Sequence, residues 1–196
     1  MSSVTSVQKA WNLAILYRQL ALAEARGQAV ANEPEPLNPK VPIKVRREAR
    51  ADRDGIDCLP QLPAYQTPGS AGMDVHAFIP EAVDGWRLLG DRICLIPTGL
   101  FIEIPEGFEI QLRSRSGLSN LGINVAGGVR TIDSDFRGEL LVPLNQTGTY
   151  PPYTVKNGDR IAQLVLSPAP QARWVIASKL SETERGTGGF GSTGSR

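Results

Sequence analysis

The stretch RICLIPTGLFIEIPEGFEIQLR, residues 92–113, decides the fold of this chain. Its short apolar runs are rich in Ile, Leu and Phe, and Pro and Gly separate them, which is typical of consecutive strands with no helix between them. Similar runs recur on both sides, at IKVRR (43–47), MDVHAF (73–78), INVAG (123–127), ELLVPL (139–144), RIAQLVL (160–166) and RWVIASKL (173–180). The segment SGLSNLG (116–122) offers a turn of helix at most. Short strands at this spacing predict an all-β sandwich or barrel.

Both ends of the chain differ from this pattern. Residues 5–26 have apolar side chains at helical spacing, Thr5 and Gln8 resemble a capping box, and Gly27 is a natural helix stop. A Pro-rich linker follows at 31–42. We therefore expect an N-terminal helix and linker over 1–40, a β core over 41–180 and a C-terminal arm over 181–196. The helix is too interrupted by charge to span a membrane, and its apolar face is expected to pack on the assembly or on another protein.

Charge and cysteine content restrict the classes of partner. With 196 residues, 41% of them hydrophobic, the chain can bury one ordinary core. A formal net charge of +1 gives no global field, so we expect neither membrane nor direct nucleic-acid binding, and any anion site must be local. Cys58 and Cys94 have no metal-like or redox spacing, which favours a reducing compartment such as the cytoplasm, although residues 1–40 could also be an organellar presequence. The single histidine, His76, lies in a predicted strand, where a structural role is expected.

The C-terminal segment RGTGGFGSTGSR, residues 185–196, has the composition of an anion-binding arm. Backbone N–H groups of its glycines, the hydroxyls and the arginine at each end can surround a phosphate. Phe190 stands among glycines and has no core to join, so it is expected to stack on something flat, such as a base. A flexible Gly/Ser linker is the alternative.

Four segments of the core accompany this tail, and all five in this order resemble the five motifs of the trimeric deoxyuridine triphosphate nucleotidohydrolases, the dUTPases. They are PAYQTPGSAGMDV (63–75), RSRSGLSNLGI (113–123), TIDSDFRGEL (131–140) and NGDRIAQLVL (157–166). The resemblance runs from about Val41 to the C-terminus. It implies a homotrimeric β-barrel or jelly-roll that hydrolyses dUTP to dUMP and diphosphate with Mg²⁺. Such an enzyme limits uracil incorporation into DNA and supplies dUMP for thymidylate synthesis, and each of its sites combines segments of three subunits.

The chemistry of triphosphate cleavage needs a base to deprotonate water, a metal to gather phosphate oxygens and donors to neutralise the leaving charge. Asp133 follows a β-type run at a turn, where its carboxylate can reach a water, and the resemblance assigns it as the base. A turn-capping aspartate is the alternative for Asp133 and the preferred reading of Asp135.

Phosphate contacts are expected at the start of the short helical turn. The resemblance places Ser116 at the phosphates around the scissile bond and Arg115 and Gly117 beside them, whereas a serine cap with a solvated arginine is the alternative. It also implies that Asp74 reaches the metal through water and that Gln163 contacts the phosphates.

Base and sugar recognition is assigned to the hairpin between Asn124 and Phe136. Gly127 and Gly128 let the backbone approach the uracil edge, and Phe136 stands where the family commonly has the Tyr that lies under the deoxyribose. A core Phe is the alternative for that ring. Arg130 departs from the family, since many members have Gly near this place. The implied substrate-binding set is completed by Thr131 on the hairpin and by Arg185, Phe190, Gly191, Ser192 and Thr193 on the arm.

Two other functions compete with this interpretation. The dCTP deaminases share the fold, but their catalytic Glu corresponds here to Pro143, which can neither accept nor donate a proton. A non-catalytic regulatory module is the second alternative, although such a module has no need of a water-activating base.

Overall fold

The computed structural model of the chain describes residues 40–52, 54–80 and 83–189. The predicted helix over 5–26 and the arm residues Phe190, Gly191, Ser192 and Thr193 lie outside these ranges. In chain order the elements are β1 (Lys44–Arg47), β2 (Arg50–Ala51), β3 (Asp57–Cys58), β4 (Ala64–Tyr65), β5 (Met73–His76), β6 (Trp86–Arg87), β7 (Cys94–Glu103), β8 (Phe108–Arg113), α2 (Ser116–Ser119), β9 (Ile123–Val125), β10 (Arg130–Ile132), β11 (Glu139–Gln146), β12 (Thr154–Val155) and β13 (Arg160–Pro168). The prediction of an all-β chain is confirmed.

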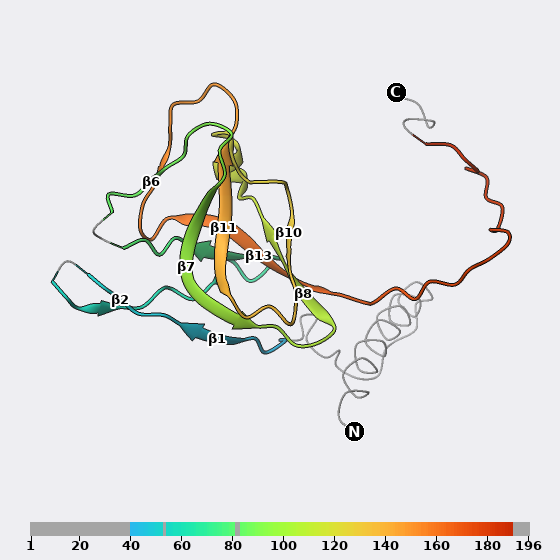
Figure 1. Cartoon of the computed structure of the whole chain (residues 1–196), viewed down its shortest axis with the longest axis horizontal. Coiled ribbons are helices and arrows are strands. Elements are labelled where there is room, and N and C mark those ends of the chain that lie inside the picture. Colours follow the sequence, from blue (N-terminus) through green and yellow to red (C-terminus); the bar gives the residue numbers. More distant parts are fainter. Residues whose placement is uncertain (1–39, 53, 81–82, 190–196) are drawn as a thin grey trace.

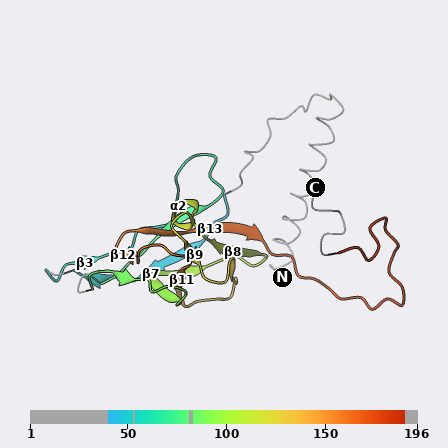
Figure 2. The same ribbon diagram turned by 90° about the horizontal axis from the view of Figure 1, so that it is seen from above.

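Two antiparallel sheets form the two layers of a jelly-roll-like barrel. One has the strand order β1-β7-β11-β9 and the other β10-β8-β13-β5-β4, and the pairs β12-β6 and β2-β3 are smaller additions. Strands β7 and β11 run side by side across the front of the barrel (Figure 1). Seen from above, β7 and β11 lie on one side and β8 and β13 on the other (Figure 2).

The hydrophobic core lies between these layers and follows the alternation of the strands. Leu140, Val142 and Leu144 of β11 are buried while Leu141 between them is exposed, as period-2 geometry requires. The buried cluster also contains Ile96 of β7 and Leu164 of β13, so both sheets contribute to it. At about 25 cal/mol per Å² of buried apolar area, this shared core is the main force that holds the two sheets together.

The runs RICLI and LFIEI join into the single strand β7, although PTG lies between them. Gly99 has a φ of 65°, and a Cβ there would lie 2.6 Å from Cδ1 of Phe78, so only glycine fits this position. The register against β11 shifts between Glu139 and Leu141, which is a bulge opposite this part of β7. The bulge and Gly99 let one long strand bend across the barrel instead of ending.

The predicted strand at 173–180 is wrong for the single chain. In the described residues the chain forms no strand after Pro168, and the segment extends away from the barrel (Figure 1). Trp174, Ile176 and Leu180 are 93%, 102% and 82% exposed. The run has β-type composition but no neighbouring strand to pair with, and an unpaired strand does not form alone. Within the described ranges no helix is long and apolar enough to cross a membrane.

Candidate active site

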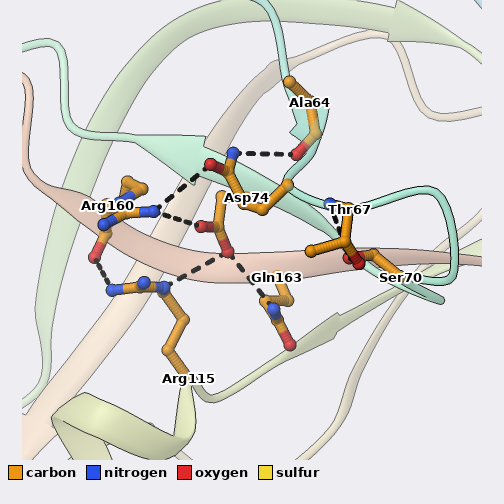
Figure 3. Close-up of polar contacts among 8 residues, drawn as sticks. Ala64, Thr67, Ser70, Asp74, Arg115, Arg160 and Gln163 are labelled. Atoms are coloured by element: carbon orange, nitrogen blue, oxygen red, sulfur yellow. Dashed lines mark hydrogen bonds and ion pairs between the residues drawn. The ribbon is translucent and has the colours of Figure 1, made fainter.

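Asp74 on β5 is the one acidic side chain that is buried in the described part of the chain, with 2% of its surface exposed. Its Oδ1 accepts hydrogen bonds from Nε of Arg115 and from Nε2 of Gln163, both at 3.2 Å. Its Oδ2 accepts one from Nη1 of Arg160 at 3.3 Å (Figure 3). The side chains of three sequence motifs therefore meet on one carboxylate, and we call Asp74, Arg115, Arg160 and Gln163 the Asp74 cluster.

The register of the sheet explains why these residues meet. Gln163 of β13 pairs with Asp74 of β5 on one side and with Arg113 of β8 on the other. Arg115 comes two residues after the end of β8 and turns back toward the carboxylate, where Nη1 also donates to the carbonyl of Arg160 at 3.1 Å. The cluster thus closes the end of three neighbouring strands.

The two ion pairs of Asp74 also stabilise the fold. Breaking a buried ion pair by removing one partner costs about 3–5 kcal/mol, because the remaining charge stays desolvated. Arg115 and Arg160 retain 23% and 46% side-chain exposure, so their cost is toward or below the low end of that range. Their partial exposure also leaves donors that can bind an anion from solvent.

His76 follows directly behind this cluster on β5, and its Nδ1 is buried with no hydrogen-bond partner among the described residues. Burial is the main cause that lowers the pKa of His76, Asp74 raises it, and Arg160 and Arg115 lower it further. The imidazole is neutral at pH 7, which agrees with the structural role expected for it.

The short helix α2 begins directly beside the cluster. Arg115 occupies its N-cap position without a side-chain cap bond, and the N–H groups of Leu118 and Ser119 bond to the carbonyl of Arg115. The first N–H groups of a helix, here those of Ser116 and Gly117, have no intrahelical partner. The alternative of a solvated arginine is wrong, since the Arg115 guanidinium is bound to Asp74 and lies only 23% exposed.

The hairpin between β9 and β10 is fastened to this same region. Ser114, which departs from the family pattern, accepts a hydrogen bond from the N–H of Val125 at 2.8 Å. Ser119 of α2 donates to Oδ1 of Asn124 at 2.8 Å. Gly127 and Gly128 form the tip with φ of 78° and 83°, values that favour glycine. The predicted hairpin is confirmed as a structural element.

On the outer side of this hairpin lies a pocket of about 440 Å³. Asp133 follows β10 and is exposed, and no hydrogen bond or ion pair to its carboxylate is found among the described residues. Phe136 is 43% exposed, so the alternative of a core Phe is wrong. Its ring lies over Gly138, where a Cβ would come within 2.7 Å of Cζ. The lining residues are Ile93, Leu95, Leu112, Arg130, Thr131, Ile132, Asp133, Phe136, Glu139, Leu140, Leu141 and Pro143.

Within one chain Asp133 and the Asp74 cluster are far apart. Strand β10 is separated from β5 by β8 and β13, which amounts to about 14 Å at the usual strand spacing. Ile132 pairs with Ile110, whereas Gln163 pairs with Arg113, which adds about 10 Å along the strands. A general base acts over a single hydrogen bond. The two groups therefore cannot serve the same phosphorus within one protomer.

The C-terminal arm does not complete the site within the chain either. Arg185 is exposed, its Nε donates to the carbonyl of Gly188 at 2.8 Å, and the segment that carries it lies away from the barrel in both views (Figures 1 and 2). Of the predicted site residues, the structure thus groups Asp74, Arg115 and Gln163 near α2, and groups Thr131, Asp133 and Phe136 at the pocket.

Two functional contacts were missed by the sequence reasoning. Arg160 lies in the same motif as Gln163, but three residues apart they would face opposite sides of a regular strand. A register shift between Arg160 and Ala162 lets both reach Asp74. Glu139, which ends the Asp133 motif, accepts hydrogen bonds from Nη2 of Arg50 at 3.1 Å and from the N–H of Gly99 at 2.8 Å. An acidic residue directly after the motif was the available signal for this anchor.

An all-β barrel with a cluster of arginines at one end and an exposed carboxylate at a pocket is consistent with the class of β-barrel hydrolases that act on phosphate esters. Comparison with known proteins identifies the family. The sequence model of the dUTPase family matches residues 60–194, and the chain belongs to that family.

Curated relatives agree with this assignment. The chain is 52% identical over 134 residues to the deoxyuridine 5′-triphosphate nucleotidohydrolase of Desulfotalea psychrophila, covering 68% of this chain and 87% of that protein. The protein of the same description from Maricaulis maris is 49% identical over 142 residues, with coverage of 69% and 88%.

Solved structures show the same fold. A Staphylococcus bacteriophage 80alpha dUTPase with dUpNHpp matches with a TM-score of 0.59 at 21% identity, covering 79% of this chain and 99% of that one. A mutant dUTPase from phage phi11 of S. aureus, described with a structural Mg(II) ion, matches with a TM-score of 0.58 at 19% identity, with coverage of 72% and 100%.

Proposed function

We propose that this chain hydrolyses dUTP to dUMP and diphosphate, with Asp133 activating the attacking water. The observation that carries the proposal is the contrast between an exposed, unbonded carboxylate at a pocket and a separate cluster of arginines. The activity of the curated relatives supports the substrate. Such an activity would limit uracil incorporation into DNA and supply dUMP for thymidylate synthesis.

In this mechanism the water oxygen attacks the α-phosphorus while its proton passes to the Asp133 carboxylate. The bond from the α-phosphorus to the bridging oxygen breaks, and diphosphate leaves. Arg115 uses Nε for Asp74 and Nη1 for the carbonyl of Arg160, so Nη2 is left to bind a phosphate oxygen. Ser116 and Gly117 at the start of α2 supply further donors to the departing charge.

The donor set fits Mg²⁺ held mainly by the substrate. Among the described residues no group of three His, Cys, Asp or Glu side chains could form a protein cage for a metal. Mg²⁺ retains several waters and binds substrate phosphates, so such a cage is not needed. Gln163 donates Nε2 to Asp74 while its Oε1 points away from that carboxylate, free to accept from a metal-bound water (Figure 3). When bound, the ion would gather the phosphate oxygens and withdraw charge from the α-phosphorus.

We further propose that the active form is a homotrimer whose sites are shared between protomers. The separation of Asp133 from the Asp74 cluster supports this, because a second copy can bring the missing group to each site. The exposed Trp174, Ile176 and Leu180 support it as well, since a segment this apolar is expected to be covered in the assembly. The arm with Arg185, Phe190, Gly191, Ser192 and Thr193 would then close over the nucleotide of a neighbouring site. The division at residues 40 and 180, the role of residues 1–40 and the compartment stay predictions.

The pocket supports recognition of a deoxyuridine. The glycine tip lets the hairpin backbone approach the uracil edge, Thr131 lies beside it on β10, and Phe136 offers a partly exposed ring for the sugar. A ring that fills the space at the 2′-carbon would exclude a hydroxyl there. The deaminase alternative is disfavoured because Pro143 lines the pocket with no group that could move a proton.

A nucleotide panel tests the proposal. Purified protein with Mg²⁺ is given dUTP, UTP, dCTP and dTTP, and both diphosphate release and the base of the product are measured. We expect diphosphate and dUMP from dUTP, with UTP, dCTP and dTTP at least about ten-fold poorer in kcat/KM. Conversion of dCTP to a uracil nucleotide would establish the deaminase, and binding of dUTP without turnover would establish the inert module. Equal kcat/KM for UTP and dUTP would show that Phe136 is not the sugar platform.

A further inference from the structure

Arg130 is the one basic residue among the described residues that line the pocket of Asp133 and Phe136. It begins β10 and pairs with Leu112 of β8, so its backbone is fixed by the sheet. Its side chain runs back across the hairpin, where Nε donates to the carbonyl of Ala126 at 2.8 Å. An arginine at this place is fastened at Nε and presents its two terminal nitrogens beyond that bond.

The guanidinium lies against the tip of the hairpin. A Cβ on Gly127 would be 3.1 Å from Nη2 and 3.3 Å from Cζ of Arg130, so any larger residue at 127 would push the guanidinium away. Gly127 also has a φ of 78°. The absence of a side chain at 127 therefore serves two ends, the turn itself and the close approach of Arg130.

The terminal N–H groups of Arg130 are available to a ligand. A guanidinium carries five N–H donors and no acceptor. Within the described part of the chain, the bond to Ala126 is the only hydrogen bond or ion pair that involves this side chain. Part of the hairpin backbone, by contrast, is already engaged, because the N–H of Ala126 bonds to Pro143 and the N–H of Gly128 bonds to Val125. Donors for a base edge are thus scarce on the backbone and abundant on Arg130.

We propose that Arg130 is a specificity-determining residue that donates hydrogen bonds from its terminal nitrogens to the carbonyl oxygen at position 4 of uracil. Position 4 is where uracil carries an oxygen acceptor and cytosine carries an amino donor. A group that can only donate attracts the first and opposes the second, and it cannot invert its polarity as an amide can. This inference rests on the proposed function, since it takes the pocket at Asp133 to be the nucleotide site.

The test compares full-length wild-type protein with Arg130→Met, which keeps the length of the side chain but removes every donor. Arg87→Met on β6 is the matched control, because Arg87 is exposed and does not line the pocket. For Arg130→Met we expect kcat/KM for dUTP to fall roughly 10- to 100-fold, the usual worth of a hydrogen bond to a charged group, with dCTP unchanged or improved. The ratio of kcat/KM for dUTP to that for dCTP should therefore fall at least about ten-fold. Arg87→Met should keep both values.

A second measurement needs no substitution. Replacing the oxygen at position 4 by sulfur, as 4-thio-dUTP, weakens the acceptor, so wild-type protein should prefer dUTP over 4-thio-dUTP. Arg130→Met should lose most of that preference.

Equal use of 4-thio-dUTP and dUTP by the wild type would overturn the inference. So would an Arg130→Met variant that keeps the dUTP to dCTP ratio, or one that turns over dUTP faster because the side chain had blocked the pocket. In each of these cases wild-type hydrolysis of dUTP would still stand, whereas a wild type inactive on dUTP would refute the proposed function itself.

Discussion

Asp74 and Asp133 are carboxylates of the same chain in opposite environments. Asp74 is 2% exposed and receives hydrogen bonds from two arginines and a glutamine, whereas Asp133 is exposed beside a pocket with no bonded partner in the described residues. A carboxylate whose oxygens are occupied by cations holds neighbouring side chains in place. A carboxylate without partners is free to take a proton from water. The difference teaches that the surroundings of an acidic side chain, more than its presence in a motif, indicate its role.

Replacing the free carboxylate should produce the largest effect. Asp133→Asn removes the base and should lower kcat by about 10²–10⁴-fold. Because the side chain is exposed and unbonded, the free energy of unfolding should change by no more than about 0.5 kcal/mol. Diphosphate release and urea unfolding measure the two quantities. Asp135→Asn, in the same loop, is the matched control and should retain turnover. Near-normal kcat in Asp133→Asn would remove the basis for the comparison.

Truncation after Glu184 asks whether the region around Asp133 needs the arm for catalysis. An open site leaves the phosphates hydrated and poorly aligned, so kcat for dUTP should fall by about 10²-fold or more. Light scattering should still show the trimer, and binding of dUMP should change little because dUMP has no γ-phosphate to grip. If the truncated protein turns over dUTP like the full chain, the arm is a linker.

The Asp74 cluster should respond in stability where Asp133 responds in turnover. Asp74→Asn leaves two arginines facing a neutral amide and should lower the free energy of unfolding by about 2–4 kcal/mol, below the full cost of a broken buried pair because both arginines reach solvent. Denaturant unfolding at one fixed protein concentration measures the loss. A change within about 0.5 kcal/mol would show that the cluster does not stabilise the fold.

The smallest effect should come from His76 beside that cluster. Burial lowers its pKa, so the unfolded chain takes up a proton on this imidazole at a higher pH than the folded chain does. This contribution is therefore fully present above about pH 6.5 and is lost as the pH falls through that value toward the lower folded pKa. His76→Gln should flatten the dependence of unfolding free energy on pH between about 7.5 and 5.5. An unchanged slope would assign the dependence to other groups.

The sequence was sufficient for the strands and for the motif residues, because alternation and ordered motifs are local properties. It predicted β5, β8, β11 and β13 and the helical turn at α2. It could not show that Arg160 joins Gln163 on one face, since this depends on a register shift in the paired sheet. Nor could it show that the run at 173–180 forms no strand, because pairing depends on a neighbour that local composition does not report. For the same reason the motifs were visible while their separation into two groups was not.

The account's central claim is that the two groups act together only across copies of the chain. It is tested most directly by mixing two variants that are each inactive as pure trimers, Asp133→Asn and Ser116→Ala. Equal amounts are unfolded together, refolded and assayed for diphosphate release from dUTP. If each site takes Asp133 from one copy and Ser116 from another, random assembly gives about one quarter of sites with both native residues, and about a quarter of wild-type activity should return. If both residues act within one chain, no protomer in the mixture carries an intact pair. Activity no higher than that of the separate variants would then contradict the account.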